Sequence, residues 1–129
     1  MSTIKLGDLS PTRDLLYVKD TVAGFIEIAK SDLLVGQDCN ISTNSEISIK
    51  NLAELIINEI NPSAKIIVDK ERLRPKNSEV YRLFGCNKKI LENTNWKINY
   101  SFKSAIKETI EWFRVKDNLS RYKHNIYNI

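Results

Sequence analysis

The amino-acid sequence predicts an α/β fold, and three observations carry that prediction. Short runs of aliphatic and β-branched residues alternate with segments whose apolar residues recur at helical spacing. No internal repeat or low-complexity tract interrupts this alternation. At 129 residues, with 42% hydrophobic and 28% charged residues, the chain has the length and composition of one globular domain.

The N-terminal elements are two short strands and a helix. The runs TIKL at 3–6 and LLYV at 15–18 predict strands on either side of the turn-prone GDLSPTRD. An amphipathic helix is predicted over 19–30, because apolar residues there follow helical spacing and are expected to form core. This apolar stripe comprises Val18, Val22, Phe25, Ile26 and Ala29. The alternating CNIST at 39–43 predicts a further strand.

The second helix has the clearest start signal in the chain. Ser48 is a favourable N-cap, and Pro62 ends the helix because it excludes its predecessor from helical geometry. Its apolar stripe comprises Ile49, Leu52, Ala53, Ile56 and Ile60. The following KIIVD at 65–69 predicts a strand.

Two helices are predicted in the C-terminal third. The first spans 87–93 and is opened by Asn87, and the second spans 102–115 and is capped by Ser101. Residues 116–129 have mixed signals, so we expect a partly disordered tail there.

Composition excludes several classes of protein. No apolar run approaches the ~18 residues of a membrane span, and MSTIKLGDLS lacks a secretory pattern, so we expect a soluble, cytoplasmic protein. Cys39 and Cys86 lack CxxC spacing and a neighbouring histidine, which predicts two buried free thiols. His124 is the one histidine, which leaves little material for a zinc site or a histidine-based triad.

The net charge of +4 raises the alternative of nucleic-acid binding. Lysines and arginines alternate with acidic residues along most of the chain, and only RLRPK and RYKH are locally basic. This dispersed charge argues against a nucleic-acid partner.

Arginines beside loops are the candidate binding residues. Arg13 precedes the predicted strand at 15–18, and Arg72 and Arg74 stand just before Pro75. A guanidinium is a rigid fork of donors that matches phosphate oxygens, so two of them from distant segments could clamp a diphosphate.

Ordinary surface ion pairs are the competing interpretation, and spacing alone favours them. Arg13 would then pair with Asp14 or Asp20, and Arg74 with Glu71 or Glu79. Each such pair contributes roughly 0 to 1 kcal/mol to stability.

An ordered set of motifs favours the diphosphate clamp over ordinary surface ion pairs. RDLLYVKDTVAGF, CNISTNSEISIKNLAELI, RLRPKNSEVYRL, NKK, NW and SFKSAIKETIEWF follow one another in the chain. Together they resemble the C-terminal part of the extended short-chain dehydrogenase/reductase family, the NAD-dependent epimerases and dehydratases of nucleotide sugars. The resemblance runs from about residue 3 to residue 115. It is greatest to the 4,6-dehydratases that open the legionaminic-type amino-sugar pathway of polysaccharide biosynthesis.

The resemblance implies a substrate and a set of site residues. The substrate is a UDP- or GDP-linked hexose or N-acetylhexosamine, whose diphosphate Arg13 and Arg74 would contact. Glu79 would accept hydrogen bonds from the ribose, Gly7 would lie beside the nucleobase, and Arg72 is a further candidate. Asp14 and Asp20 would be structural, either by satisfying backbone donors or by orienting Arg13.

Two features that the family needs for redox chemistry do not occur in the sequence. The glycine-rich turn that holds NAD is not formed by the four scattered glycines, Gly7, Gly24, Gly36 and Gly85. No tyrosine is followed four residues later by the lysine that lowers a catalytic tyrosine pKa; the tyrosines are Tyr17, Tyr81, Tyr100, Tyr122 and Tyr127.

We therefore expect residues 1–115 to be the edge of the Rossmann sheet with the smaller substrate domain, without the N-terminal dinucleotide-binding sheet. Such a segment would bind no NAD and be inactive alone. The alternative is a standalone, non-catalytic binding or regulatory protein that pairs with a full-length homologue. In either case Phe25 and Ile41 would lose partners, which predicts marginal stability, a homo-oligomer or association with a Rossmann half.

Overall fold

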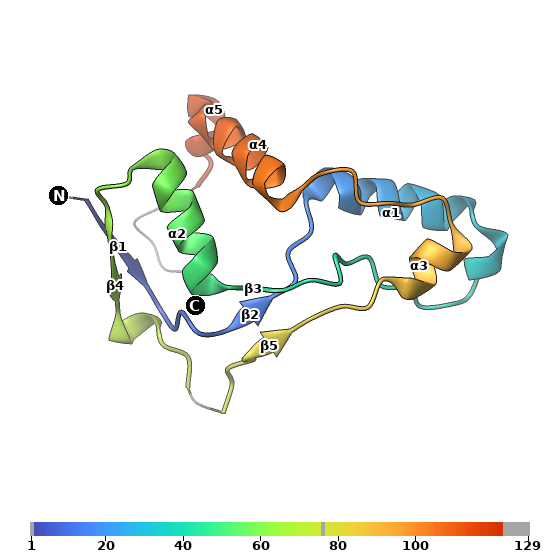
Figure 1. Ribbon diagram of the computed structural model, residues 1–129, viewed down its shortest axis with the longest axis horizontal. Coiled ribbons are helices and arrows are strands. Elements are labelled where there is room, and N and C mark those ends of the chain that lie inside the picture. Colours follow the sequence, from blue (N-terminus) through green and yellow to red (C-terminus); the bar gives the residue numbers. More distant parts are fainter. Residues whose placement is uncertain (1, 76, 123–129) are drawn as a thin grey trace.

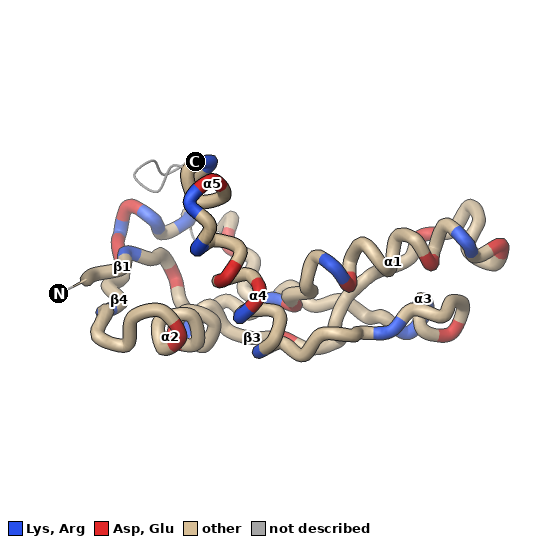
Figure 2. Tube along the Cα trace, turned by 90° about the horizontal axis from the view of Figure 1, so that it is seen from above, with Lys and Arg blue, Asp and Glu red and all other residues tan. Residues whose placement is uncertain are grey.

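The computed structural model describes residues 2–75 and 77–122 and has a mixed α/β architecture (Figure 1). Its elements are β1 (Thr3–Leu6), β2 (Thr12–Arg13), α1 (Val18–Lys30), η1 (Asp32–Leu34), β3 (Ile47–Ser48), α2 (Ile49–Ile60), β4 (Lys65–Val68), η2 (Lys70–Arg72), β5 (Arg82–Leu83), α3 (Lys88–Asn93), α4 (Phe102–Arg114) and α5 (Lys116–Leu119). The β1–β4 sheet and α2 lie at one end of the molecule, and α1 and α3 lie at the other (Figures 1 and 2).

Two small sheets form the β structure. In the first, β1 and β4 are parallel, from Thr3 opposite Lys65 to Leu6 opposite Val68, which confirms the strands predicted at 3–6 and 65–69. The second has the order β3-β2-β5, with β2 antiparallel to β3 and parallel to β5. Because β2 is the middle strand, its residues are held from both sides.

The predicted helices form where their patterns place them, and two of the three predicted caps are confirmed. Ser48 Oγ accepts from Asn51 N at 3.1 Å, and Ser101 Oγ accepts from Ser104 N at 3.2 Å. The Asn87 side chain makes no cap bond to α3. It instead donates from Nδ2 to the Ser42 carbonyl at 3.1 Å, because this buried amide lies against the loop at 42.

Two predicted strands are wrong. Residues 15–17 form no strand and Val18 begins α1, so Arg13 belongs to β2 itself instead of preceding a strand at 15–18. The CNIST segment at 39–43 has no strand partner either. The backbone N–H groups from Cys39 to Ser42 donate no hydrogen bond to main-chain carbonyls of the described residues. A strand pattern becomes a strand only where a neighbour supplies the ladder.

Helix α1 is oriented opposite to the expectation from its apolar stripe. Its fully buried residues are Asp20 and Gly24. The stripe lies on the exposed face, where Val18, Val22, Phe25 and Ile26 are 63%, 51%, 65% and 50% exposed. Ile41 keeps a partner, contrary to the expectation, because a Cβ on Gly24 would lie only 2.7 Å from Ile41 Cγ2. Glycine at this position therefore permits the close approach of the 39–43 segment.

The core is small for a chain of this length. The buried hydrophobic residues in the described part are Leu34, Ile57, Ile90, Trp96, Ala105 and Ile110. The accessible surface is 9731 Å², whereas a compact monomer of 14.9 kDa exposes roughly 7,000 Å². Much apolar surface is left uncovered.

A single carboxylate, that of Asp14, joins three segments beside β2. Its Oδ1 accepts from Thr43 N at 2.9 Å and from Thr43 Oγ1 at 2.6 Å. Its Oδ2 accepts from Asn44 N at 3.0 Å and from Gly85 N at 3.4 Å. Asn44 is held at φ 56° in this turn. The expectation that Asp14 satisfies backbone donors is confirmed.

Asp20 has the same structural role at the start of α1. Asp20 is only 1% exposed. Its carboxylate accepts hydrogen bonds from Asn99 N at 3.1 Å and from Tyr100 N at 3.2 Å. Its main-chain oxygen accepts from Trp96 Nε1 at 2.9 Å. These bonds fix the segment that leads into α4 against α1.

The cysteines and the tail differ in part from expectation. Both cysteines are free, but Cys39 is only half-buried and Cys86 is exposed. The expected tail at 116–129 begins with helix α5, and residues 123–129 lie outside the described residues. Within the described part, no helix combines the length and apolar character required to cross a bilayer.

We expect the exposed stripe of α1 to cause self-association. Phe25→Glu places a charge on that stripe and should lower the association constant, because it removes exposed apolar area from the contact. Sedimentation velocity over a range of concentrations measures this, with Gln37→Glu as a control that adds the same charge elsewhere. A chain that stays monomeric and melts cooperatively at high temperature would contradict the expectation.

We expect Asp14→Asn to lower the free energy of unfolding by about 1–3 kcal/mol, because one amide nitrogen would face backbone donors that a carboxylate oxygen now satisfies. Asp38→Asn removes the same charge from an exposed residue and serves as the control. Urea unfolding monitored by tryptophan fluorescence gives both values. Equal urea midpoints of unfolding for the two variants would show that the hydrogen bonds of Asp14 do not contribute to stability beyond the effect of its charge.

Candidate functional site

Arg13 is held on the middle strand by two acceptors. Its Nη1 donates to the Thr12 carbonyl at 2.7 Å, and its Nη2 lies 3.3 Å from Glu79 Oε1. The Arg13 and Glu79 side chains are only 20% and 11% exposed. The predicted pairing with Asp14 or Asp20 is wrong, since both of those carboxylates accept bonds from backbone donors. The structure thus joins two of the predicted site residues.

Two further predicted site residues, Gly7 and Arg72, lie in contact where η2 ends. A Cβ on Gly7 would lie 2.4 Å from the Arg72 carbonyl oxygen, so only glycine permits this approach. Arg72 Nε lies 3.7 Å from Asp69 Oδ2. The turn at Gly7 is therefore packed directly against the start of the arginine-rich loop.

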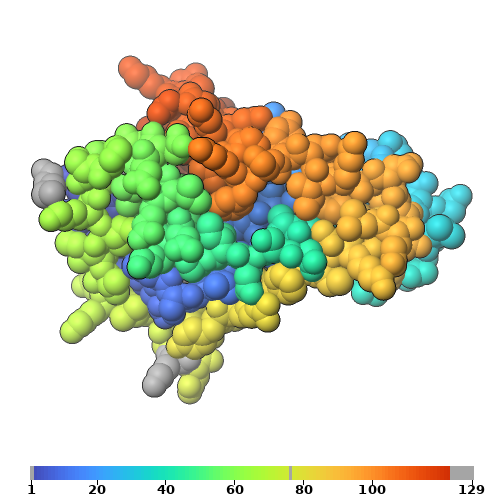
Figure 3. All heavy atoms as spheres, in the orientation of Figure 1, coloured from blue at the N-terminus to red at the C-terminus, as the bar shows by residue number. Residues whose placement is uncertain are grey.

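Arg74 lies on the exposed loop between η2 and β5, which projects from the body of the molecule (Figures 1 and 3). Its predicted ion pairs with Glu71 and Glu79 do not occur among the described residues, where Glu79 pairs with Arg13 instead. An exposed arginine on a projecting loop is available to an anion that reaches this edge.

Arg82, which the sequence analysis missed, forms a cluster with Thr12 and Glu46 on the other face of the three-stranded sheet. Its Nε donates to both carboxylate oxygens of Glu46 at 2.9 Å, and Thr12 Oγ1 donates to Glu46 Oε2 at 2.7 Å. Neighbouring strand residues point to opposite faces, so this cluster lies opposite Arg13. The alternation in YRLF at 81–84 is the signal that could have located it.

The pKa shifts at this cluster have a local cause. The hydrogen bonds from Arg82, and then that from Thr12, lower the pKa of Glu46, and Glu46 in turn raises the pKa of Arg82. The guanidinium also lies 4.9 Å from the Phe84 ring centroid. Arg82 is thus satisfied by its neighbours and joins β5 to the loop before β3.

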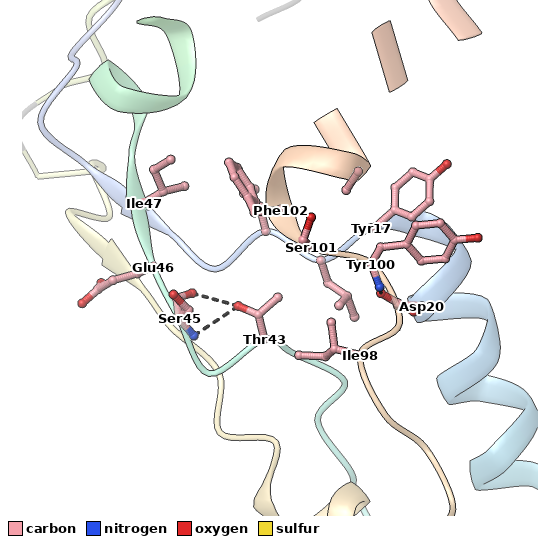
Figure 4. A pocket seen from close by; sticks show the side chains of 13 residues that line it. Tyr17, Asp20, Thr43, Ser45, Glu46, Ile47, Ile98, Tyr100, Ser101 and Phe102 are labelled. Carbon is pink, nitrogen blue, oxygen red and sulfur yellow. Dashed lines mark hydrogen bonds between the residues drawn. The ribbon is translucent and has the colours of Figure 1, made fainter. Parts of the chain in front are cut away.

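A pocket of about 440 Å³ lies beside the sheet, between residues 15–17, 43–47 and the start of α4 (Figure 4). Its lining is mainly apolar and consists of Leu15, Leu16, Tyr17, Asp20, Thr43, Ser45, Glu46, Ile47, Ile98, Tyr100, Ser101, Phe102 and Ala105. None of the predicted site residues lines this pocket. The Arg13–Glu79 pair therefore lies outside this pocket.

Two tyrosines beside this pocket belong to a polar network. Tyr17 OH donates to Glu108 Oε2 at 2.8 Å, and Lys19 Nζ lies 2.7 Å from the same oxygen. The Tyr17 and Tyr100 rings pack edge to face at 4.8 Å between centroids.

The electrostatics of this network do not suit a tyrosine base. The hydrogen bond to Glu108 is the main cause that raises the pKa of Tyr17, and the bond from Lys19 is the main cause that lowers the pKa of Glu108. The Glu108 bond also raises the pKa of Lys19. A tyrosine that acts as a base in hydride transfer needs the opposite shift. The described residues also contain no group of three or more histidine, cysteine, aspartate or glutamate side chains placed to hold a metal.

Comparison with known proteins identifies relatives of the chain. The human dTDP-D-glucose 4,6-dehydratase is 34% identical over 118 residues, which are 88% of this chain and 32% of the human protein. Other relatives have names of enzymes of UDP- and GDP-linked sugars. The chain therefore spans about a third of the length of the relatives that it matches.

Solved structures confirm the predicted fold class. An epimerase from Methanothermobacter thermautotrophicus matches with a TM-score of 0.81 and 22% identity over 93% of this chain and 35% of that structure. RMD from Pseudomonas aeruginosa, solved as a complex with NADPH, matches with a TM-score of 0.72 and 22% identity, over 93% and 37% of the two chains. The mixed α/β chain thus has the fold of part of these larger proteins.

A family model described as GDP-mannose 4,6-dehydratase matches residues 1–109, which include both sheets and most of α4. This match covers the candidate site residues Arg13, Arg74 and Glu79. The chain therefore belongs to the GDP-mannose 4,6-dehydratase family.

Proposed function

We propose that this chain is the nucleotide-sugar-binding, C-terminal portion of an NAD-dependent 4,6-dehydratase or epimerase. Residues 1–115 would form the binding segment, with Arg13 and Arg74 holding the diphosphate. Gly7 and Arg72 would flank the nucleotide, and Glu79 would lie near the ribose. The ligand would be a UDP- or GDP-linked hexose or N-acetylhexosamine in the cytoplasm.

The half-buried guanidinium of Arg13 is the observation that carries this proposal. It is fixed by the Thr12 carbonyl on the central strand, and its other N–H donors, including the Nη2 that now contacts Glu79, would be offered to a ligand. A preorganised fork of this kind binds phosphate oxygens in pairs and loses little side-chain freedom when it does so. Arg74 would reach the same diphosphate from the projecting loop.

Catalysis would require residues that this sequence does not contain. The raised pKa of Tyr17 supports this view, because Tyr17, which lies two residues before Lys19, is thereby kept in the protonated form that cannot act as a base. A dinucleotide-binding Rossmann half would supply NAD and the catalytic tyrosine and lysine. The chain alone would bind substrate and do no redox chemistry.

The RLRPKNSEV motif and the RDLLYV motif support a finer placement among the 4,6-dehydratases of the legionaminic-type amino-sugar pathway. In that placement the sugar would be an N-acetylglucosamine derivative destined for a surface polysaccharide. Comparison of binding among UDP-N-acetylglucosamine, UDP-glucose and GDP-mannose distinguishes this placement from a general dehydratase role.

Calorimetric titration with UDP, UDP-N-acetylglucosamine and GDP-mannose tests the binding proposal. Arg13→Ala and Arg74→Ala should each weaken binding by about tenfold or more, since each removes a charge-assisted hydrogen bond to the diphosphate. Lys107→Ala removes one positive charge from an exposed position of α4 and should leave the affinity unchanged. Equal affinities of the unmodified chain and all three variants would contradict the proposed arginine clamp.

A second candidate function is that of a standalone, non-catalytic partner of a full-length family member. Two observations favour it: the exposed stripe of α1, with Phe25 65% exposed, and the segment at 39–43, which pairs with no strand. An uncovered apolar helix face and unpaired extended backbone are suited to cover and extend the edge of a sheet.

Co-expression with a full-length homologue tests this second function. The tagged chain should co-purify with the homologue in stoichiometric amounts, and Phe25→Glu should abolish the complex because it charges the centre of the stripe. The Gln37→Glu variant should co-purify as well as the unmodified chain. Loss of the complex in both variants, or in neither, would count against docking through α1.

A further inference from the structure

The ion pair between Arg13 and Glu79 differs from the other ion pairs of the described residues in its burial. Its two side chains are 20% and 11% exposed. Every other pair has at least one side chain that is 33% exposed or more. Water screens this pair less than the others, so the charge on each partner strongly affects the other.

Glu79 occupies the position on Arg13 that an incoming phosphate would need. The Nη2 to Oε1 distance of 3.3 Å brings one carboxylate oxygen against the guanidinium. A phosphate bound to the same fork would meet that carboxylate as a like charge at close range. Glu79 and a diphosphate therefore compete for the same guanidinium of Arg13.

The contact is suited to be exchanged. It is a single bond, and it is longer than the roughly 2.7–2.9 Å typical of a charge-assisted N–H to carboxylate bond. In contrast, Arg82 meets Glu46 with Nε and Nη2 at 2.8 to 2.9 Å. Of the two carboxylates that pair with an arginine of this sheet, Glu79 is the one that its arginine holds less firmly.

The backbone around Glu79 permits its side chain to move away from Arg13. Glu79 lies in the irregular segment between η2 and β5, where Ser78 N donates to the Pro75 carbonyl at 2.8 Å in a local turn. The sheet is reached at Tyr81, whose carbonyl accepts from Thr12 N at 2.8 Å. Glu79 can therefore leave Arg13 by a side-chain rotation that breaks no bond of the ladder.

We propose that Glu79 is an exchangeable counterion, which neutralises Arg13 while the site is empty and is displaced when a nucleoside diphosphate binds. This inference rests on the proposed function of Arg13. The carboxylate stabilises the half-buried guanidinium without ligand, and its displacement subtracts from the affinity for the diphosphate. Once displaced, the carboxylate is free to accept hydrogen bonds from ligand hydroxyl groups.

A double-mutant cycle with UDP and inorganic pyrophosphate as probes tests the exchange. Glu79→Gln keeps the shape of the side chain and removes its charge, so it should tighten pyrophosphate binding on the order of tenfold. UDP binding should tighten less, because the amide that replaces the carboxylate is a weaker acceptor for the ribose hydroxyl groups. In the Arg13→Ala background the same change should leave pyrophosphate binding unchanged and should slightly weaken UDP binding, because only the contact with the ribose is then affected.

Glu71→Gln, on the neighbouring exposed turn, removes an equal charge and should leave both affinities unchanged. If Arg13→Ala does not fold, as judged by thermal melting, Arg13→Gln replaces it, because its amide can still donate to the Thr12 carbonyl.

The outcomes separate the two proposals. Weaker binding in Arg13→Ala with no gain in Glu79→Gln over Glu71→Gln overturns the counterion role alone. A gain in Glu79→Gln that persists in the Arg13→Ala background also overturns it, because the effect would not act through Arg13. Unchanged binding in Arg13→Ala, or no binding by any variant, overturns the arginine clamp and the counterion role together.

Discussion

The Asp14 carboxylate is the constraint on which the centre of this structure depends. The three-stranded sheet consists of strands of two residues, which are too short to define a register by their own ladder bonds. Asp14 follows β2 directly and accepts bonds from the turn at 43–44, which precedes β3, and from Gly85, which follows β5. One side chain thus ties all three strands at one end. Arg13 is the residue before it, so the same bonds that order the sheet also place the guanidinium.

The two arginine–carboxylate pairs around the sheet differ in how firmly the carboxylate is held. On one face, Glu46 meets Arg82 with both oxygens and also accepts from Thr12, an arrangement that fastens β5 to the segment before β3. On the other face, Glu79 meets Arg13 by one longer bond from an irregular segment. In our proposal, Arg13 binds a ligand and needs a partner that can leave, whereas Arg82 is structural and needs one that stays.

The large exposed surface and the arginine site have a common explanation in the proposed function. Helix α1 presents its apolar stripe to solvent, and the 39–43 segment beside it has free backbone groups. Arg13 is largely buried and Arg74 is exposed on a loop, and neither lines the 440 Å³ pocket. In our proposal, a Rossmann half would cover the stripe and pair with the 39–43 segment. It would also contribute the residues that complete a substrate cleft. The chain spans about a third of the relatives that it matches, which agrees with this picture.

The sequence by itself determined the α/β class, the starts of α2 and α4, and the candidate role of Arg13, since periodicity, caps and motif order are local properties of the chain. Tertiary structure decided which patterns became elements. The runs at 15–18 and 39–43 remain unpaired, because a strand requires a neighbour that local sequence cannot supply. The stripe of α1 faces outward, because Asp20 and Gly24 take the buried face through bonds to residues 99 and 100 and contact with Ile41. The partner of Arg13 is Glu79, 66 residues away, and only the fold could select it from the nearer carboxylates.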